Sequence, residues 1–233
     1  MKNKALQDRA YEIIKERITS CVYQPGTFLN TIALQDQLGF SRTPIREAIG
    51  RLEQENLVRV IPKKGILVCE LDIHLIKAIY ETRMVLEPYI INAHGDKLDK
   101  TELQAFRLRF NWKDITPETK EHFYRYDDDF HAFIRAACPN IYLAQALDRI
   151  ADQSRRVRVL SGNVIRRLEE TCAEHISIID PLLEGDPRTA AGAMMVHLEN
   201  SRTTAFSLLL DLNSPVPLPF HDLASSLPGR QGA

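Results

Sequence analysis

The sequence predicts a mainly α-helical protein, in which a small helix-and-hairpin domain precedes an all-α helical bundle of six or seven helices. Three observations favour this fold class. Two β-rich runs stand close together within the first seventy residues. From about residue 72 to residue 212, apolar residues recur at helical spacing without a convincing strand. The segment 213–233 holds four prolines and few helix formers, which predicts a flexible Pro-rich tail behind domains at 1–70 and 71–212.

Composition excludes several classes of protein. The 233 residues can bury a core, and 44% hydrophobic and 26% charged residues are typical of a soluble globular chain. The sequence has no apolar run of eighteen residues and no secretory signal, so we expect a cytoplasmic protein without a membrane partner. The four cysteines stand far apart without a C-x-x-C pair, which favours free thiols over disulfides.

The first two elements and their connection can be placed from periodicity and turn residues. Apolar residues at helical spacing predict an amphipathic helix over residues 6–20. Pro25 and Gly26 then predict a turn. A short helix is expected over residues 31–38, with Gly39 as its C-terminal stop.

A second short helix and a hairpin complete the first domain. The stretch "SRTPIREAIGRLEQENL" (41–57) predicts a helix with Thr43 as its N-cap and Pro44 at its first position. The stretch "LVRVIPKKGILVCEL" (57–71) predicts two β-strands around a turn at residues 62–65. Beyond it, Gly and Pro residues divide the helical region. These breaks fall near residues 95–96, 116–117, 139–140, 161–162 and 185–187.

The first domain has the outline of a winged helix-turn-helix with a basic, DNA-facing end. Residues 1–70 carry 11 Lys and Arg against 8 Asp and Glu, whereas the remainder carries 19 against 23. Arg42, Thr43 and Arg46 lie at the end of the second helix that a recognition helix presents to bases, where arginine can pair with guanine. Ser41 suits a phosphate oxygen, and Lys64 at the hairpin tip suits the backbone. The alternative is a small helical domain with solvated arginines.

The stretch from "PGTFL" to "GILV" resembles the DNA-binding domain of the GntR family of bacterial transcription regulators. The resemblance covers the Pro-Gly turn, "LGFSRTPIREAI", "RLEQENLV" and the glycine of the wing. It implies that the chain binds operator DNA as a homodimer. A basic contact used by one branch of the family is missing, because Thr31 and Ile32 stand at that point. Residues that match the family's DNA contacts are Ser41, Arg42, Thr43, Arg46, Lys64 and Gly65.

Four polar residues of the bundle fall on inward helix faces. On a helical wheel, Asp127 and His131 lie together at the edge of an apolar arc, whereas Asp128 and Asp129 face solvent. His175 and His197 likewise share faces with apolar residues. Buried polar groups need partners, and one divalent ion would satisfy all four. Imidazole and carboxylate ligands suit Zn²⁺ first, or Ni²⁺ or Mn²⁺. Hydrogen-bonded core histidines remain the alternative reading of the residues alone.

The helical region resembles the FCD-type effector domain of the FadR subfamily of GntR regulators. The resemblance rests on "YETRMVLEPYIINAH", on "DDDFHAFIRAACPNIYL" and on two later histidines at the expected places. Members with an Asp and three His bind a divalent metal in the bundle core, and members lacking this set bind acyl-CoA. The resemblance therefore implies a metal at Asp127, His131, His175 and His197 and argues against the acyl-CoA branch.

Two arginines are candidates for binding a small carboxylate effector. Arg83 falls among inward apolar residues, where a guanidinium needs a planar acceptor. It can pair with Glu87 one turn later, or bind an effector carboxylate. The run "SRRVR" offers a second cation, with Arg155 as our candidate, although the pattern does not show which of its arginines faces inward.

Together these features predict a ligand-responsive DNA-binding repressor rather than an enzyme. A metalloenzyme fused to a DNA-binding module is the alternative from another class, but we find no general base on the inner helix faces. A regulator that senses the metal itself is a further alternative.

Overall fold

The protein is a mainly α-helical, two-part molecule, which confirms the predicted fold class. Its structure, a computed structural model, describes residues 2–111, 116, 119–161 and 165–212. The predicted tail lies outside the described residues. No helix within the described ranges is long and apolar enough to cross a membrane.

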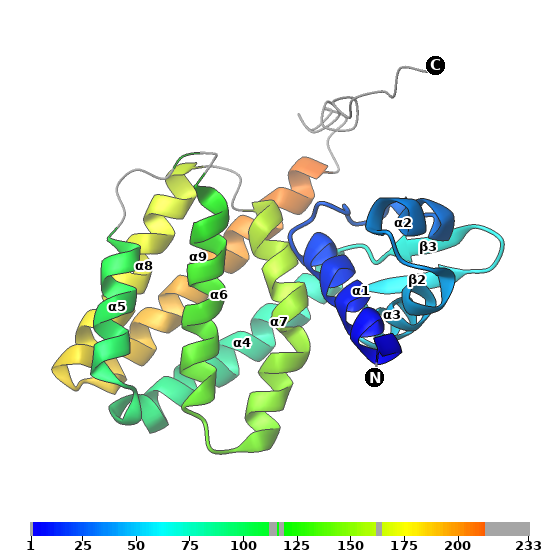
Figure 1. Ribbon diagram of the computed structural model, residues 1–233. Coiled ribbons are helices and arrows are strands. Elements are labelled where there is room, and N and C mark those ends of the chain that lie inside the picture. The colour runs from blue at the N-terminus through cyan, green and yellow to red at the C-terminus, as the bar shows by residue number, and fades with distance from the viewer. Residues whose placement is uncertain (1, 112–115, 117–118, 162–164, 213–233) are drawn as a thin grey trace.

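The N-terminal part consists of three helices and a small antiparallel sheet, with strand order β1-β3-β2 (Figure 1). The strands of the wing, β2 and β3, pair from Val58 with Val68 to Ile61 with Gly65. The bounds of these elements are α1 (Lys2–Thr19), β1 (Phe28–Leu29), α2 (Thr31–Leu38), α3 (Arg42–Gln54), β2 (Val58–Ile61) and β3 (Gly65–Val68).

Two details of this part differ from the sequence prediction. The N-cap of α3 is Ser41 in extended backbone, not Thr43, so Thr43 and Pro44 lie inside the first turn. Strand β1 was missed because two residues are too short for a period-2 pattern. Gly65 shows why the wing turns where it does: its φ is +116°, and a Cβ there would meet the carbonyl oxygen of Leu29 at 2.9 Å. A side chain at this position would push β1 away from β3.

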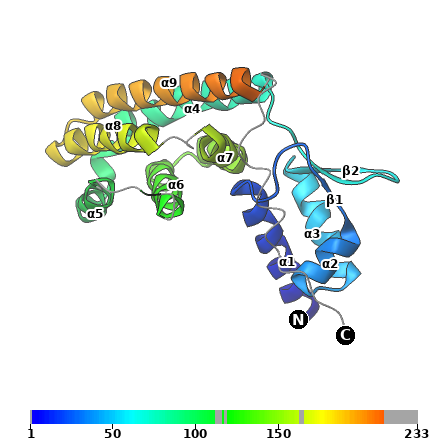
Figure 2. The same ribbon diagram turned by 90° about the horizontal axis from the view of Figure 1, so that it is seen from above.

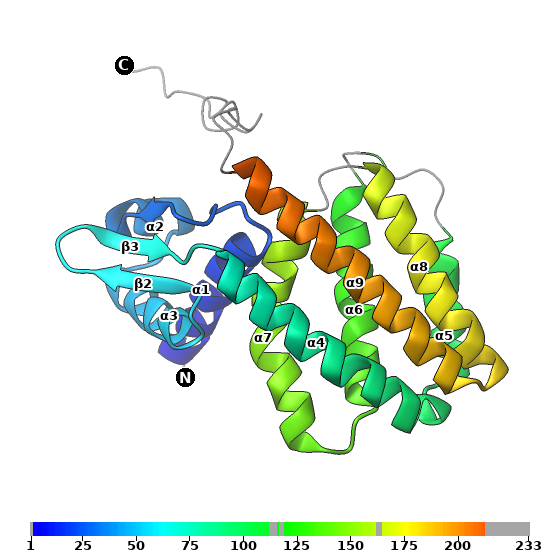
Figure 3. The same ribbon diagram turned by 180° about the vertical axis from the view of Figure 1, so that it is seen from behind.

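The C-terminal part is a bundle of α-helices. Helices α4 and α9 lie side by side across one face, α7 and α8 pack against this pair, and α5 and α6 lie farthest from it (Figures 2 and 3). Gly185, in left-handed conformation at φ +84°, ends α8. The bounds are α4 (Ile73–His94), a short 3-10 helix (Gly95–Lys97), α5 (Lys100–Phe110), α6 (Lys120–Ala136), α7 (Ile141–Ser161), α8 (Ile165–Glu184) and α9 (Pro187–Leu212).

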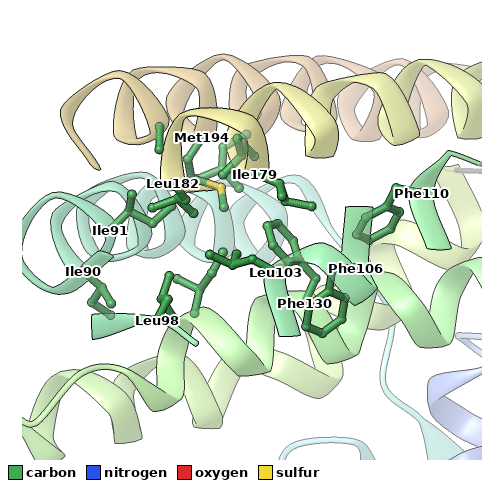
Figure 4. Packing of buried hydrophobic residues seen from close by; sticks show 14 of the residues in the cluster. Ile90, Ile91, Leu98, Leu103, Phe106, Phe110, Phe130, Ile179, Leu182 and Met194 are labelled. Atoms are coloured by element: carbon green, nitrogen blue, oxygen red, sulfur yellow. The ribbon is translucent and has the colours of Figure 1, made fainter. Parts of the chain in front are cut away.

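The core of the bundle is apolar at one end and polar in its middle. Phe106, Phe110 and Phe130 pack with ring centroids 5.4–6.4 Å apart, and Figure 4 shows them with leucines and isoleucines of the neighbouring helices. The imidazole of His175 lies 4.3 Å from the ring centroid of Phe110. Phe110 and Phe130 pack directly against the ring of His175 and so restrict its position.

Candidate functional site

Four side chains from three helices meet in the middle of the bundle. Asp127 and His131 come from α6, His175 from α8 and His197 from α9. Each can present one ligand atom such that all four atoms lie within 4.8 Å of one another. Asp127, His175 and His197 are fully buried, and His131 is 7% exposed. The i, i+4 spacing of Asp127 and His131 puts both on one face of α6.

The donor atoms of this cluster fit a divalent cation. The ring nitrogens of His175, the Nε2 of His197 and the Oδ1 of Asp127 are buried polar atoms without a hydrogen-bond partner among the described residues. Buried polar atoms normally find partners, so a group of unpartnered atoms from three helices that lie this close together needs an explanation. A metal ion bound by three imidazoles and one carboxylate would supply it, and these are the ligand types of Zn²⁺ and its first-row neighbours.

Two of the histidines are held by carboxylates that are themselves clamped by arginines. His131 Nδ1–H donates to Glu87 Oε2 at 2.7 Å, and Arg83 Nε donates to Glu87 Oε1 at 2.6 Å. Such a carboxylate fixes the imidazole tautomer with Nε2 as the acceptor, which lies 3.1 Å from Arg83 Nη2 here and would be the ligand atom toward a metal. Sequence reasoning assigned Glu87 only to Arg83 and gave it no role toward the histidine.

The second clamp uses residues that the sequence reasoning missed. His197 Nδ1–H donates to Glu174 Oε2 at 2.8 Å. Arg167 donates to both oxygens of Glu174, at 2.8 and 3.0 Å, and Asn200 donates to Oε1. Burial opposes ionisation of Glu174, but these donors lower its pKa to about 2. The clue available in the sequence was an i, i+7 spacing of Arg167 and Glu174, two turns apart on one helix face.

We expect Glu174→Gln to weaken metal binding by about 10- to 100-fold while leaving the fold intact. Glutamine is nearly isosteric, but its amide lacks the charge that holds His197 and Arg167 in place. The measurement is a competition titration of the purified chain against a zinc chelator. Glu170→Gln, which changes a half-exposed carboxylate on the same helix, is the matched control. Equal affinities for both variants would contradict the orienting role of Glu174.

Asp127 is paired with one arginine. Arg158 Nε lies 2.5 Å from Asp127 Oδ2, so the other oxygen, Oδ1, remains toward the histidines, 3.3 Å from His175 Nε2. Burial opposes ionisation, but Arg158 and the three imidazoles hold the pKa of Asp127 below its ordinary range. Of the "SRRVR" arginines, Arg158 is therefore the one that contacts the cluster.

Acidification should destabilise the metal-free protein below about pH 6.5. Burial lowers the pKa of His131 to about 4 and that of His175 well below its ordinary value. Below about pH 6.5 the unfolded chain binds protons at both residues and the folded chain does not. The free energy of unfolding therefore decreases as the pH is lowered, by up to about 1.4 kcal/mol per histidine per pH unit. Urea midpoints of chelator-treated protein at about pH 7.5 and about pH 5 measure this. Equal midpoints would contradict buried, neutral histidines.

A cavity of about 250 Å³ adjoins the cluster between α4, α6 and α7. Arg83 and Arg155, the two arginines predicted to bind an effector, both line it, together with Arg158 and His131. Arg83 is paired with Glu87, which is one of the two roles predicted for it. Arg155 is paired with Glu16 outside the cavity and with Asp128 in its wall. Asp128 corrects a prediction: it is half-buried and paired with Arg155 and Arg158 rather than facing solvent, because α7 covers that face of α6.

The residues predicted to contact DNA, apart from Gly65, are exposed at the start of α3 and at the wing. Ser41, Arg42 and Thr43 are exposed at the start of α3, and Arg46 follows one turn later with a side chain that is 77% exposed. Lys64 is exposed at the tip of the wing. Gly65 stands apart from them, since its tight contact with β1 gives it a structural reason for being glycine.

Comparison with known proteins identifies both parts of the chain. Residues 6–68 match the model of the family described as bacterial regulatory proteins, gntR family, and residues 78–200, just over half of the chain, match the FCD domain. A helix-turn-helix transcriptional regulator from an unstable DNA locus of Streptomyces ambofaciens is 30% identical over 81% of this chain and 80% of its own length. The transcriptional repressor RspR of Escherichia coli K12 is 21% identical over 83% and 86%.

A solved structure shares the fold. The crystal structure of a GntR transcriptional regulator from Rhodococcus sp. RHA1 superimposes with a TM-score of 0.74 at 19% identity, covering 86% of this chain and 97% of that one. At this identity the likeness concerns the fold alone. It shows that a winged helix-turn-helix joined to a helical bundle is the architecture of this chain as a whole.

Proposed function

Because this chain belongs to the GntR family of bacterial regulatory proteins and carries an FCD domain, we propose that it is a homodimeric repressor that responds to a small carboxylate. It is a DNA-binding transcriptional regulator and not an enzyme, as its relatives and both domains indicate. It would act in the cytoplasm, where bacterial operator DNA lies. Its FCD domain would hold a divalent metal, with Zn²⁺ as the first candidate and Ni²⁺ or Mn²⁺ as alternatives.

Operator recognition would use the exposed start of α3. Arg42 and Arg46 would read base edges, with Ser41 and Thr43 on phosphates and Lys64 on the backbone beside the wing. All of these side chains are exposed rather than buried in the core of the domain. Arg46 has one weak, exposed ion pair, with Glu47 at 3.8 Å, and exposed pairs of this kind contribute little.

Dimerisation would place two winged helices on a palindromic operator. Helices α4 and α9 form an outward face that carries exposed apolar side chains, and Figure 3 shows the two helices running side by side. Val85, Tyr89 and Val196 are each more than half exposed on this face. Large exposed apolar residues at neighbouring positions are typical of protein interfaces, which supports a second copy of the chain at this face.

The observation that carries the proposal is the buried Asp/His₃ cluster beside a charged cavity in a DNA-binding chain. When bound, a divalent ion would supply a Lewis-acidic anchor for a carboxylate oxygen. Arg83 and Arg155 would provide the cations for the rest of such a ligand. A neighbouring pocket, lined by Asp127, Arg158 and His197, is only about 30 Å³ and has room for no more than water.

Footprinting of the metal-loaded protein on operator duplexes selected from random DNA tests the proposal. We expect one protected palindrome, and repression of a reporter that carries it. A thermal-shift screen should find a small carboxylate that raises the melting temperature of the wild-type protein more than that of Arg83→Gln, and the same acid should relieve repression. Specific DNA binding without any metal in the purified chain would contradict the metal part of the proposal alone.

A further inference from the structure

We propose that Arg155 is an anion-sensitive link between the two domains: a small organic anion in the cavity competes with Glu16 for its guanidinium and so loosens the DNA-binding domain from the bundle. This rests on the proposed function only in taking DNA binding as the output. The contacts between the domains are a property of this chain in either case.

Helix α7 is the element that joins the two domains. The outward face of α7 packs against α1 and loops of the DNA-binding domain. Figure 1 shows α7 beside α1. Asp152 pairs with Lys15 at 2.7 Å, and Gln153 Nε2 donates to the carbonyl oxygen of Asn56 at 2.9 Å. Arg156, fully buried, donates to the carbonyl oxygen of Cys69.

The opposite face of α7 is turned toward the metal cluster and lines the cavity. Ser154 Oγ accepts from Arg83 Nη1 at 3.2 Å and from Arg158 Nη1 at 2.8 Å, and Arg158 contacts Asp127. Successive residues of one helix thus serve the DNA-binding domain and the ligand-binding region in turn. A change at one face can reach the other within a single turn of helix.

Arg155 belongs to both faces. Its Nη1 and Nη2 donate to the two oxygens of Glu16 on α1 at 2.7 and 2.8 Å, and Nη1 also lies 3.1 Å from Thr19 Oγ1. Its Nε lies 2.9 Å from Asp128 Oδ2 on α6, the neighbour of the cluster residue Asp127. The same side chain lines the cavity. One guanidinium therefore bridges α1, α6 and the space where a ligand would lie.

The surroundings indicate that Arg155 is the cation that can change partner. Arg83 is 2% exposed and committed to Glu87, Ser154 and His131. Arg158 is committed to Asp127 and Asp128. Arg155 has a side chain that is 23% exposed, and its partner Glu16 is 60% exposed. Because Glu16 is well hydrated once released, exchanging it for a ligand carboxylate leaves no charge buried without a partner.

The size of the cavity sets the class of ligand. About 250 Å³ corresponds to roughly eight water molecules at about 30 Å³ each. This suits a small mono- or dicarboxylate and excludes a long acyl chain. Because Arg155 is a cation, only an anionic ligand can compete with Glu16 for it. The wall also carries the carboxylates Asp128, Asp129 and Asp152, which disfavour a ligand of high negative charge.

Releasing Glu16 would lower affinity for the complete operator more than for half of it. While Arg155 binds Glu16, the two winged helices of a dimer are fixed relative to one another, as binding to two half-sites requires. A loosened domain can still bind one half-site, but ordering the second domain then costs conformational entropy. Release of Glu16 therefore weakens binding to a palindromic operator without changing the residues that contact DNA.

A carboxylate built into the cavity wall can replace the unidentified ligand. Ala151 lines the cavity one turn before Arg155, and a Glu four residues before an Arg on a helix is well placed to pair with it. In the full-length, metal-loaded protein, Ala151→Glu should speed hydrogen exchange of the α1 amides by about threefold or more. Ala151→Gln has the same size without charge and should exchange like the wild-type protein.

Arg155→Ala provides a second variant if Ala151→Glu does not fold, with Arg149→Ala, an exposed arginine of the same helix, as its control. It should speed α1 exchange and reduce affinity for the full operator several-fold, while half-site affinity and metal content stay at wild-type values. Equal α1 exchange in Ala151→Glu and Ala151→Gln, or wild-type exchange in Arg155→Ala, would overturn the link. Failure of the wild-type protein to bind any selected operator would instead overturn the proposed function.

Discussion

Arg46→Ala should strongly weaken specific operator binding while leaving the fold and metal content unchanged. Arg46 is exposed one turn into α3, its side chain has a weak ion pair with Glu47, and the core side of the helix is formed by other residues. Loss of an arginine that pairs with a guanine costs about 1–3 kcal/mol per half-site. A dimer that uses both half-sites should therefore lose at least about thirtyfold in affinity.

Fluorescence anisotropy on the selected operator and on a scrambled duplex measures this loss. Arg188→Ala removes the same charge from an exposed position at the start of α9 and should reduce both affinities little. If Arg46→Ala lowered binding to the two duplexes equally, Arg46 would be a phosphate contact. Wild-type discrimination in Arg46→Ala would contradict the assignment of α3 as the recognition helix.

His175→Ala should remove the metal from the purified protein. Both ring nitrogens of His175 are buried without a hydrogen bond to any residue that the structure describes, and Nε2 lies 3.3 Å from Asp127 Oδ1. Removing a direct ligand should weaken binding by more than the roughly 10- to 100-fold that changes in the surrounding shell cause. Elemental analysis after gel filtration gives the metal per chain.

His74→Ala, an exposed histidine at the start of α4, is the control and should keep full occupancy. Circular dichroism separates ligand loss from unfolding, because alanine at position 175 also leaves a small cavity beside Phe110. A folded His175→Ala protein with the metal content of the wild type would remove His175 from the site.

Most of the fold could be predicted because helical periodicity and turn residues are local. Gly39 and the Gly185 turn end helices where the sequence predicts, with positive φ at both glycines. Strand β1 could not be found, since its two residues pair with β3 through a contact about forty positions away. The N-cap of α3 was placed at Thr43 because Pro44 favours a first helical position, but the helix begins earlier, after Ser41.

The candidate site could likewise be predicted in part, because positions within a helix are local and contacts between helices are not. Helical wheels placed Asp127, His131, His175 and His197 on inward faces, because facing the core depends only on position within each helix. The wheels could not show that Glu174 meets His197, or that Arg155 reaches Glu16, because these contacts depend on how helices cross. Asp128 was misjudged for that reason: the face of α6 that the wheel gave to solvent is covered by α7.

Anomalous diffraction from crystals of the protein purified without added metal tests the central claim most directly. We predict one peak per chain at a first-row metal edge, within bonding distance of Asp127 Oδ1, His175, and the Nε2 atoms of His131 and His197. Bond lengths near 2.0–2.2 Å would be expected for zinc. A folded, operator-binding protein without a peak at this position, before and after soaking with zinc, would contradict it.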